Sequence, residues 1–217
     1  MAMNSKFILL SVLFGALLFA CITFAQEEVF EYEEGSPRGP QHWGELNFPN
    51  WTTCGQGMMQ SPIDIESKDA IVAPELGPLK RNYKAARAIL RNRRHDISVE
   101  WTEDAGYITI GNTKYFLNQS HWHIPTEHRF NNKSYNMEMH MVHRSEDGRI
   151  AVIGIPYRIG FLSDKFLGKL VDKILYLSIN RNLSSINAGV VDPYDVGIGF
   201  GDSYFRYNGL PYHPTLH

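Results

Sequence analysis

The sequence predicts a mostly β protein with a few helices, an α+β chain built on one large, mainly antiparallel sheet. Two observations lead to this fold class. Five runs rich in β-branched and aromatic residues follow one another in the middle of the chain, and turn-forming residues separate them. Only one segment shows a helical repeat of apolar residues over several turns. The connections between the runs are short, which favours hairpins over helical crossovers.

The predicted strands are bounded by turn-forming sequences such as Asp104-Ala105-Gly106 and Asp147-Gly148. In chain order, these strands cover residues 98–101, 107–110, 114–124, 135–143 and 150–159. A helix is expected next, because Ser163 or Asp164 can cap it. Its apolar face repeats at steps of three and four residues and comprises Phe166, Leu167, Leu170, Val171, Ile174 and Leu177. The chain is then expected to form a loop over residues 180–200 and one more short strand over residues 204–207.

The first residues have the pattern of a secretory signal peptide. Lys6 precedes an almost wholly apolar run over residues 7–19, and Thr23-Phe24-Ala25 places small residues at the two positions that signal peptidase reads. A membrane anchor is the alternative interpretation. The run is short for a membrane span, however, and acidic, polar sequence follows from Gln26. We therefore expect cleavage after Ala25 and secretion.

The expected domain organisation has three parts: a signal peptide over residues 1–25, a loose N-terminal segment over residues 26–40 and a single domain over residues 41–217. A chain of 217 residues can bury one sizeable core. Its formal charge of −2 is weak, so neither nucleic acid nor an anionic membrane is expected as a partner after cleavage.

Two features bear on the secreted state. Four N-x-[ST] sequons predict a glycoprotein; they begin at Asn50, Asn118, Asn132 and Asn182. The chain has two cysteines, of which Cys21 lies in the apolar run and leaves with it. Cys54 then remains as an odd cysteine, which implies an intermolecular bridge, a reactive thiol or a missing partner. A disulfide dimer through Cys54 is therefore possible.

The residues with the most distinctive chemistry are histidines on neighbouring predicted strands. His121 and His123 are two positions apart and face the same way, and His140 on the next strand can face them across the ladder. Three imidazoles leave a fourth tetrahedral position open, as in catalytic zinc sites. A paired polar face is the alternative. His128 and His143 fit the spacing less well and are expected to be structural, although either could close the site as a fourth ligand.

Side chains that could orient these rings are also present. Gln119 lies two positions before His121, and Glu138 lies two positions before His140, so each could accept a hydrogen bond from the ring nitrogen that faces away from the metal. Glu127 is a further candidate for a buried carboxylate. It could orient a metal-bound hydroxide through an intervening hydroxyl group.

The zinc-binding block of the α-class carbonic anhydrases, above all of the plant members, resembles two runs of this sequence. They are His121-Trp122-His123-x-Pro-x-Glu127-His128 and Glu138-x-His140-x-Val142-His143. Other hallmark runs of that family resemble Gln60-Ser61-Pro62-Ile63-Asp64-Ile65, His42-Trp43-Gly44 and Ala151-Val152-Ile153-Gly154. The similarity extends from His42 to Gly209 and implies the large central sheet of the α-carbonic anhydrase type.

The resemblance implies an enzyme, a zinc lyase with Zn²⁺ as cofactor and carbon dioxide and bicarbonate as small-molecule substrates. A zinc-bound hydroxide would reversibly hydrate carbon dioxide to bicarbonate and a proton. The residues that match functional positions are the zinc ligands His121, His123 and His140, their hydrogen-bonding partners Gln119 and Glu138, the hydroxide-orienting Glu127, the proton-shuttle His95, and the carbon dioxide pocket walls Val142 and Val152. An exposed turn histidine beside three arginines is the alternative interpretation of His95. Routing onward to plastid or vacuole is the alternative to secretion.

The sequence departs from the family pattern after Gly209. There the family continues into Ser-Leu-Thr-Thr-Pro-Pro-Cys and further strands, whereas this chain continues over residues 210–217. The threonine that would link the metal hydroxide to Glu127 has no match, and neither has the cysteine that would pair with Cys54. The expected sheet therefore lacks its C-terminal strands. The alternative function is a catalytically impaired or inactive relative that binds zinc or serves as a storage protein.

Overall fold

The structure is a computed structural model, and it describes residues 30–47, 49–180, 182–198 and 203–211. They divide into two compact units, of which the first ends at Gln56 and the second begins at Gly57. The boundaries expected from the sequence, after residues 25 and 40, stay predictions. The expected signal peptide lies outside the described residues. Within the described part of the chain, no helix has the length and apolar character needed to cross a membrane.

The first unit is organised around aromatic rings. Its helical elements are η1 (Pro40–His42), α2 (Trp43–Leu46) and α3 (Thr52–Gln56). Phe30 meets the rings of Tyr32, Trp43 and Trp51 edge-on, at centroid distances of 5.9, 5.4 and 6.3 Å. The indole N–H of Trp43 points to the carbonyl oxygens of Glu31 and Arg38. Residues 30–40, expected to be loose, thus contribute rings and carbonyl groups to this unit.

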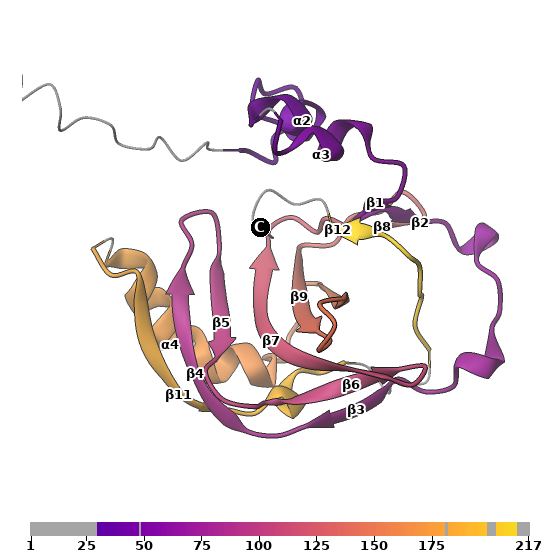
Figure 1. Cartoon of the computed structure of the whole chain (residues 1–217). Helices are drawn as coiled ribbons and strands as arrows, with labels where there is room; N and C mark the ends of the chain where they lie inside the picture. Colours follow the sequence, from indigo (N-terminus) through magenta and orange to yellow (C-terminus); the bar gives the residue numbers. More distant parts are fainter. Residues whose placement is uncertain (1–29, 48, 181, 199–202, 212–217) are drawn as a thin grey trace, which may run out of the picture. The chain divides into compact units, whose positions relative to one another are not determined.

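The second unit is built on an eight-stranded sheet (Figure 1). Its strands are β3 (Lys80–Tyr83), β4 (Ala86–Asn92), β5 (Ile97–Trp101), β6 (Gly106–Ile110), β7 (Thr113–His123), β9 (Met137–Arg144), β10 (Ile150–Tyr157) and β11 (Ser185–Val191). The order along the sheet is β10-β9-β7-β5-β4-β11, and β6 joins β3 to β7. All of these pairs are antiparallel, which confirms the predicted fold class.

Short elements complete this unit. Two parallel pairs lie outside the large sheet: β1 (Gln60–Ser61) pairs with β12 (Leu210–Pro211), and β2 (Asp64–Ile65) pairs with β8 (Arg129–Phe130). Three 3-10 turns connect the strands, namely η2 (Ser67–Asp69), η3 (Pro74–Leu76) and η4 (Pro193–Asp195). Residues far apart in sequence are therefore joined around one end of the sheet.

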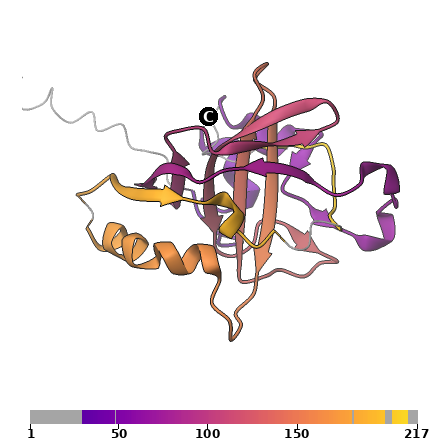
Figure 2. The same ribbon diagram turned by 90° about the horizontal axis from the view of Figure 1, so that it is seen from below.

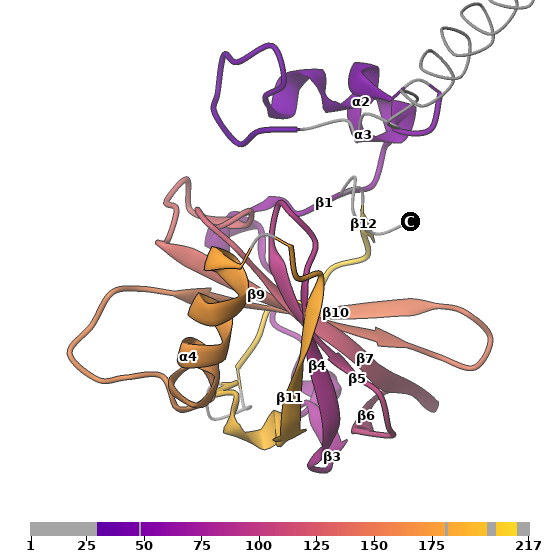
Figure 3. The ribbon, with the colours of Figure 1, turned by 90° about the vertical axis from the view of Figure 1, so that its left-hand side faces the viewer.

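The predicted helix is α4 (Lys165–Ile179), and it begins where the sequence places its cap. The Asp164 carboxylate accepts a hydrogen bond from the backbone N–H of Leu167 at 2.7 Å. The helix lies beside β11, as two views show (Figures 2 and 3). Phe166, Leu170 and Leu177 are its buried side chains. They join a core to which the sheet contributes Leu90, Val99, Met139 and Met141, each fully buried.

Two sequence predictions fail after α4. Residues 180–200 were expected to form a loop, but they contain β11 and η4. β11 departs from regular pairing, because its register with β4 shifts between Asn187 and Gly189, where Gly189 has a positive φ of 84°. The predicted strand over residues 204–207 is also wrong, because residues 203–209 form neither helix nor strand. Contacts made by side chains hold this segment in place, as described below.

Candidate metal centre

Three buried histidine rings meet on two neighbouring strands of the sheet. His121 and His123 lie on β7, and His140 lies on β9 directly opposite His121. The ring centroids are 4.8 Å apart for His121 and His123, 5.4 Å for His121 and His140, and 4.9 Å for His123 and His140. One nitrogen from each ring lies within 4.8 Å of the others. The structure therefore brings together the three rings that the sequence predicts as ligands.

A β-bulge sets the face that these rings share. The register between β7 and β9 shifts between Leu117 and Gln119, which leaves Asn118 as the extra residue. Beyond the bulge, strand alternation places Gln119, His121 and His123 on the same face. The sequence of β7 alone therefore places Gln119 and the rings of His121 and His123 on one face of the sheet.

Gln119 fixes the orientation of His121. Its amide oxygen lies 2.9 Å from Nδ1 of His121, and both side chains are buried. Because an amide oxygen only accepts, Nδ1 carries the proton and donates it to this contact. The lone pair on Nε2 is then available to a metal ion.

Glu138 performs the corresponding role behind His140. Its Oε1 lies 3.1 Å from Nε2 of His140 and 2.5 Å from Nδ1 of His128. The backbone N–H groups of Glu127 and His128 donate to Oε2 at 3.0 and 2.9 Å. Burial raises the pKa of this carboxyl, but the contacts with His128 and His140 outweigh burial and hold the pKa well below its usual range. The carboxylate in turn raises the pKa of His140 against the opposing effect of burial.

Gly154 on β10 provides the space that Glu138 occupies. A Cβ atom added at this position would lie 2.6 Å from Oε1 of Glu138 and 3.4 Å from Nδ1 of His128. Any larger residue would therefore displace the carboxylate from His140. The sequence predicts a strand here, but the requirement for glycine depends on how β10 packs against Glu138 of β9 and His128, and it has no local signal.

Glu127 lies at the edge of the cluster. Its Oε2 is 3.4 Å from Nε2 of His123 and 3.7 Å from Nδ1 of His140, and only 6% of its side chain is exposed. This carboxylate oxygen is therefore close to two of the ring nitrogens that can serve as ligands. Glu127 follows β7 in the turn that leads to β8, and its role in orienting a metal-bound hydroxide stays a prediction.

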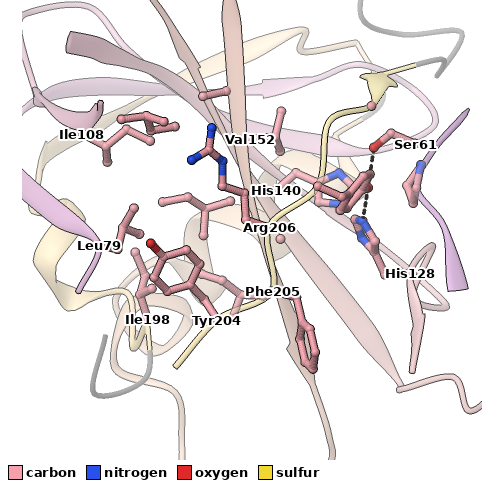
Figure 4. Close-up of a pocket in the computed structure, with 18 of the residues that line it drawn as sticks. Ser61, Leu79, Ile108, His128, His140, Val152, Ile198, Tyr204, Phe205 and Arg206 are labelled. Atoms are coloured by element: carbon pink, nitrogen blue, oxygen red, sulfur yellow. Dashed lines mark hydrogen bonds between the residues drawn. The ribbon is translucent and has the colours of Figure 1, made fainter. Parts of the chain in front are cut away.

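A chain of hydrogen bonds supports Glu138 from behind (Figure 4). Nε2 of His128 lies 2.6 Å from the hydroxyl of Tyr207, which lies 2.6 Å from the hydroxyl of Ser61. His128 is therefore the structural histidine that the sequence predicted, with a partner at each ring nitrogen. The sequence did not assign Ser61 or Tyr207 to the site, because nothing in their spacing indicates that they meet.

The remaining predicted site residues have different surroundings. The histidine cluster opens into a pocket of about 800 Å³ that Val142 and Val152 also line. These valines are directly opposite each other on β9 and β10, and Val142 is buried while Val152 is 39% exposed. His95 lies in the β4–β5 connection with Nε2 3.6 Å from Asp96, and it is not among the residues that line this pocket. Its role as a proton shuttle stays a prediction.

The donor set of the cluster fits zinc. Three imidazoles are the number of protein ligands that catalytic zinc sites use, and a fourth position is then left for solvent or substrate. The acceptor behind His121 selects the tautomer whose Nε2 is available to a metal, and the Glu138 carboxylate lies beside Nε2 of His140, which leaves Nδ1 of that ring facing the cluster. A second group of possible ligand atoms, in His128, Glu138 and His140, shares His140 with the first. Tyr207 occupies His128 there, so the cluster with His121 and His123 is the better metal site.

The comparisons with known proteins agree with this geometry. The family model for eukaryotic-type carbonic anhydrase matches residues 38–215. Dioscorin DB3L from Dioscorea polystachya is 44% identical over 95% of this chain and 76% of its own length. Carbonic anhydrase Nec1 from Nesocodon mauritianus is 41% identical over the same shares of the two chains.

Solved structures extend the agreement to the fold. A crystal structure of dioscorin complexed with ascorbate matches with a TM-score of 0.74 and 42% identity, covering 79% of this chain and 70% of that one. The Photobacterium profundum α-carbonic anhydrase matches with a TM-score of 0.69 and 27% identity, covering 86% and 79% of the two chains. Sequence and fold both lead to the same relatives, and the chain therefore belongs to the eukaryotic-type, α-class carbonic anhydrase family.

Proposed function

We propose that this chain is a zinc-dependent carbonic anhydrase that reversibly hydrates carbon dioxide to bicarbonate and a proton. One observation carries the proposal: three buried imidazoles offer nitrogens within 4.8 Å of one another at the end of an open pocket. His121, His123 and His140 would hold the metal. Zinc, when bound, would acidify a coordinated water molecule so that it can attack carbon dioxide near neutral pH.

The side chains around the cluster have separate tasks in this proposal. Gln119 and Glu138 hold two of the rings in place, so little reorganisation is needed during turnover. Glu127 presents a carboxylate oxygen beside His123 and His140 and would accept a hydrogen bond from the attacking group or from a hydroxyl next to it. Burial keeps this carboxylate away from bulk water, which strengthens such a bond.

Carbon dioxide needs an apolar surface next to the metal. Val142 and Val152 supply one, because both line the pocket that the histidines close. The proton released by each turnover must then reach solvent. We assign this step to His95, because histidine is the side chain best suited to relay protons near neutral pH.

The test is a stopped-flow measurement of carbon dioxide hydration with the zinc-loaded protein. We expect rates far above those of free zinc at equal concentration, and a loss of at least about 100-fold in the variant His140→Ala, which removes one ligand. The matched control is His42→Ala, an exposed histidine of the other unit, which should keep the full rate. Rates equal to those of free zinc would contradict the proposal.

A second candidate is a relative that binds zinc without efficient turnover. The position of His95 favours it, because this histidine does not line the pocket. Activity measured at increasing imidazole concentration separates the two candidates, since a diffusible base replaces a poor internal shuttle. Rates that rise with buffer concentration show an enzyme limited by proton transfer. One bound zinc per chain without activity at any buffer concentration would establish the second candidate.

A further inference from the structure

The segment over residues 203–209, which we call the strap, is anchored by contacts of three aromatic side chains. The Tyr204 hydroxyl donates to the carbonyl oxygen of Gly77 at 3.2 Å. The Phe205 ring lies 6.2 Å from the ring of Phe130, measured between centroids. Tyr207 reaches His128 and Ser61 as described above. The backbone on both sides of Arg206 is thereby held in place.

Arg206 differs from its neighbours in the strap. Its side chain is exposed, and its guanidinium group makes no hydrogen bond or ion pair with the described part of the chain. It nevertheless lines the pocket. Figure 4 shows the Arg206 side chain extending from the strap between Ile108 and Val152, on the side away from His128. A cation with five donors is thus presented to the pocket from an anchored backbone.

The surroundings of Arg206 are apolar on one side and charged at the rim. Leu79, Ile108, Ile198 and Val152 belong to the same pocket, and the first three lie away from the histidine end in Figure 4. At the rim, Lys80 is an exposed second cation and Glu75 is an exposed carboxylate. Among the residues that the structure describes, two further acidic residues line the pocket, and both Glu127 and Glu138 lie against the histidines.

We propose that this part of the pocket binds a small organic carboxylate with an apolar, preferably aromatic, body. The guanidinium group of Arg206 would pair with the carboxylate in a planar, bidentate contact. Leu79 and Ile198, which are partly exposed, would cover the apolar body. A volume of about 800 Å³ is sufficient for a ligand of this size. A multiply charged phosphate suits the site less, because the wall beside Arg206 is apolar and Glu75 adds a carboxylate to the pocket.

Binding of a ligand to Arg206 would restrict little of the protein's conformational freedom. The strap is already fixed by Tyr204 and Tyr207, so only the side chain of Arg206 loses freedom on binding. The site does not depend on the proposed zinc chemistry. It can therefore be tested in the metal-free protein, where a carboxylate has no metal ion to bind.

The experiment is calorimetric titration of the full, metal-free chain with three probes. Cinnamate carries both the carboxylate and the aromatic body, cinnamamide keeps the body without the charge, and acetate keeps the charge without the body. We expect cinnamate to bind at least tenfold more tightly than either of the others. The variant Arg206→Gln should weaken cinnamate binding at least tenfold and leave cinnamamide unchanged.

The control variant is Arg158→Gln, which removes an exposed arginine outside the pocket and should leave cinnamate affinity unchanged. Equal affinities for cinnamate and cinnamamide would overturn the proposal, and so would unchanged cinnamate binding in Arg206→Gln. Binding that appears only after zinc is added would also overturn it, since the carboxylate would then belong to the metal centre. None of these results depends on whether the zinc-loaded protein hydrates carbon dioxide.

Discussion

The side chains behind the histidines decide which ring nitrogens are available to a metal. Gln119 fixes Nδ1 of His121, and Glu138 approaches Nε2 of His140, so different nitrogens of the two rings face the cluster. The two rings stand at an interplanar angle of 89°. The rings of His121 and His140 can therefore point toward one position, although they start from different strands.

Replacing Gln119 by leucine tests this arrangement. The leucine side chain cannot accept a hydrogen bond, so Nδ1 of His121 loses its partner. The ring then loses its fixed orientation. We expect the affinity for zinc to fall roughly 10- to 100-fold, as measured by competition with a chromophoric chelator. The control is Asn118→Ala, which alters the exposed side chain next to it. Equal zinc affinities in the two variants would show that Gln119 does not orient the ligand.

Among the helices and strands, the sequence predicts those that are marked by residue patterns within the element itself. β5, β6, β7, β9, β10 and α4 all occur within two residues of their expected bounds, because turn residues and apolar periodicity mark them. β4 was not predicted, although its buried Ala86, Ala88 and Leu90 alternate with the more exposed Arg87, Ile89 and Arg91. β11 was missed because Asn187 and Gly189 interrupt the expected strand pattern with a bulge.

The strap shows what local patterns cannot predict. Its aromatic residues suggest a strand, but their partners are Gly77, Phe130 and His128, which come from distant parts of the chain. The same limit applies to the candidate site. Strand alternation predicted that Gln119, His121 and His123 share a face, and the assumed pairing of neighbouring strands predicted that His140 lies opposite them. The contacts by which Ser61 and Tyr207 support the site join residues far apart in the sequence, so they depend on the complete fold.

The helix offers a test of capping. Asp164 accepts a hydrogen bond from a backbone N–H group in the first turn of α4. We expect Asp164→Ala to lower the free energy of unfolding by about 1 kcal/mol, measured by urea denaturation. Asp172→Ala is the matched control, because Asp172 is an exposed carboxylate within the same helix. A loss in Asp172→Ala as large as that in Asp164→Ala would contradict a specific capping role.

For the whole molecule, His143 links stability to pH. The side chain is fully buried, with Nε2 2.8 Å from the Tyr83 hydroxyl and Nδ1 3.3 Å from the carbonyl oxygen of Ala151. Burial lowers its pKa to about 4, from an ordinary value of 6.5, although the backbone carbonyl groups oppose the shift. Between these two values the unfolded chain binds a proton that the folded chain does not.

Stability should therefore fall as the pH is lowered from about 6.5 to about 4. A shift of this size corresponds to roughly 3 kcal/mol from His143 alone. We expect the dependence of unfolding free energy on pH to be weaker in His143→Gln than in the unmodified, metal-free protein, measured by urea denaturation across this range. Parallel pH profiles for the two proteins would show that His143 does not contribute.

The central claim is that three histidines bind a zinc ion and leave one position open. X-ray absorption spectroscopy of the zinc-loaded protein tests this most directly. We expect three imidazole nitrogens and one oxygen around the metal, at about 2.0–2.1 Å. A fourth imidazole, or a sulfur neighbour at about 2.3 Å, would contradict it, because either ligand would close the position that hydration of carbon dioxide requires.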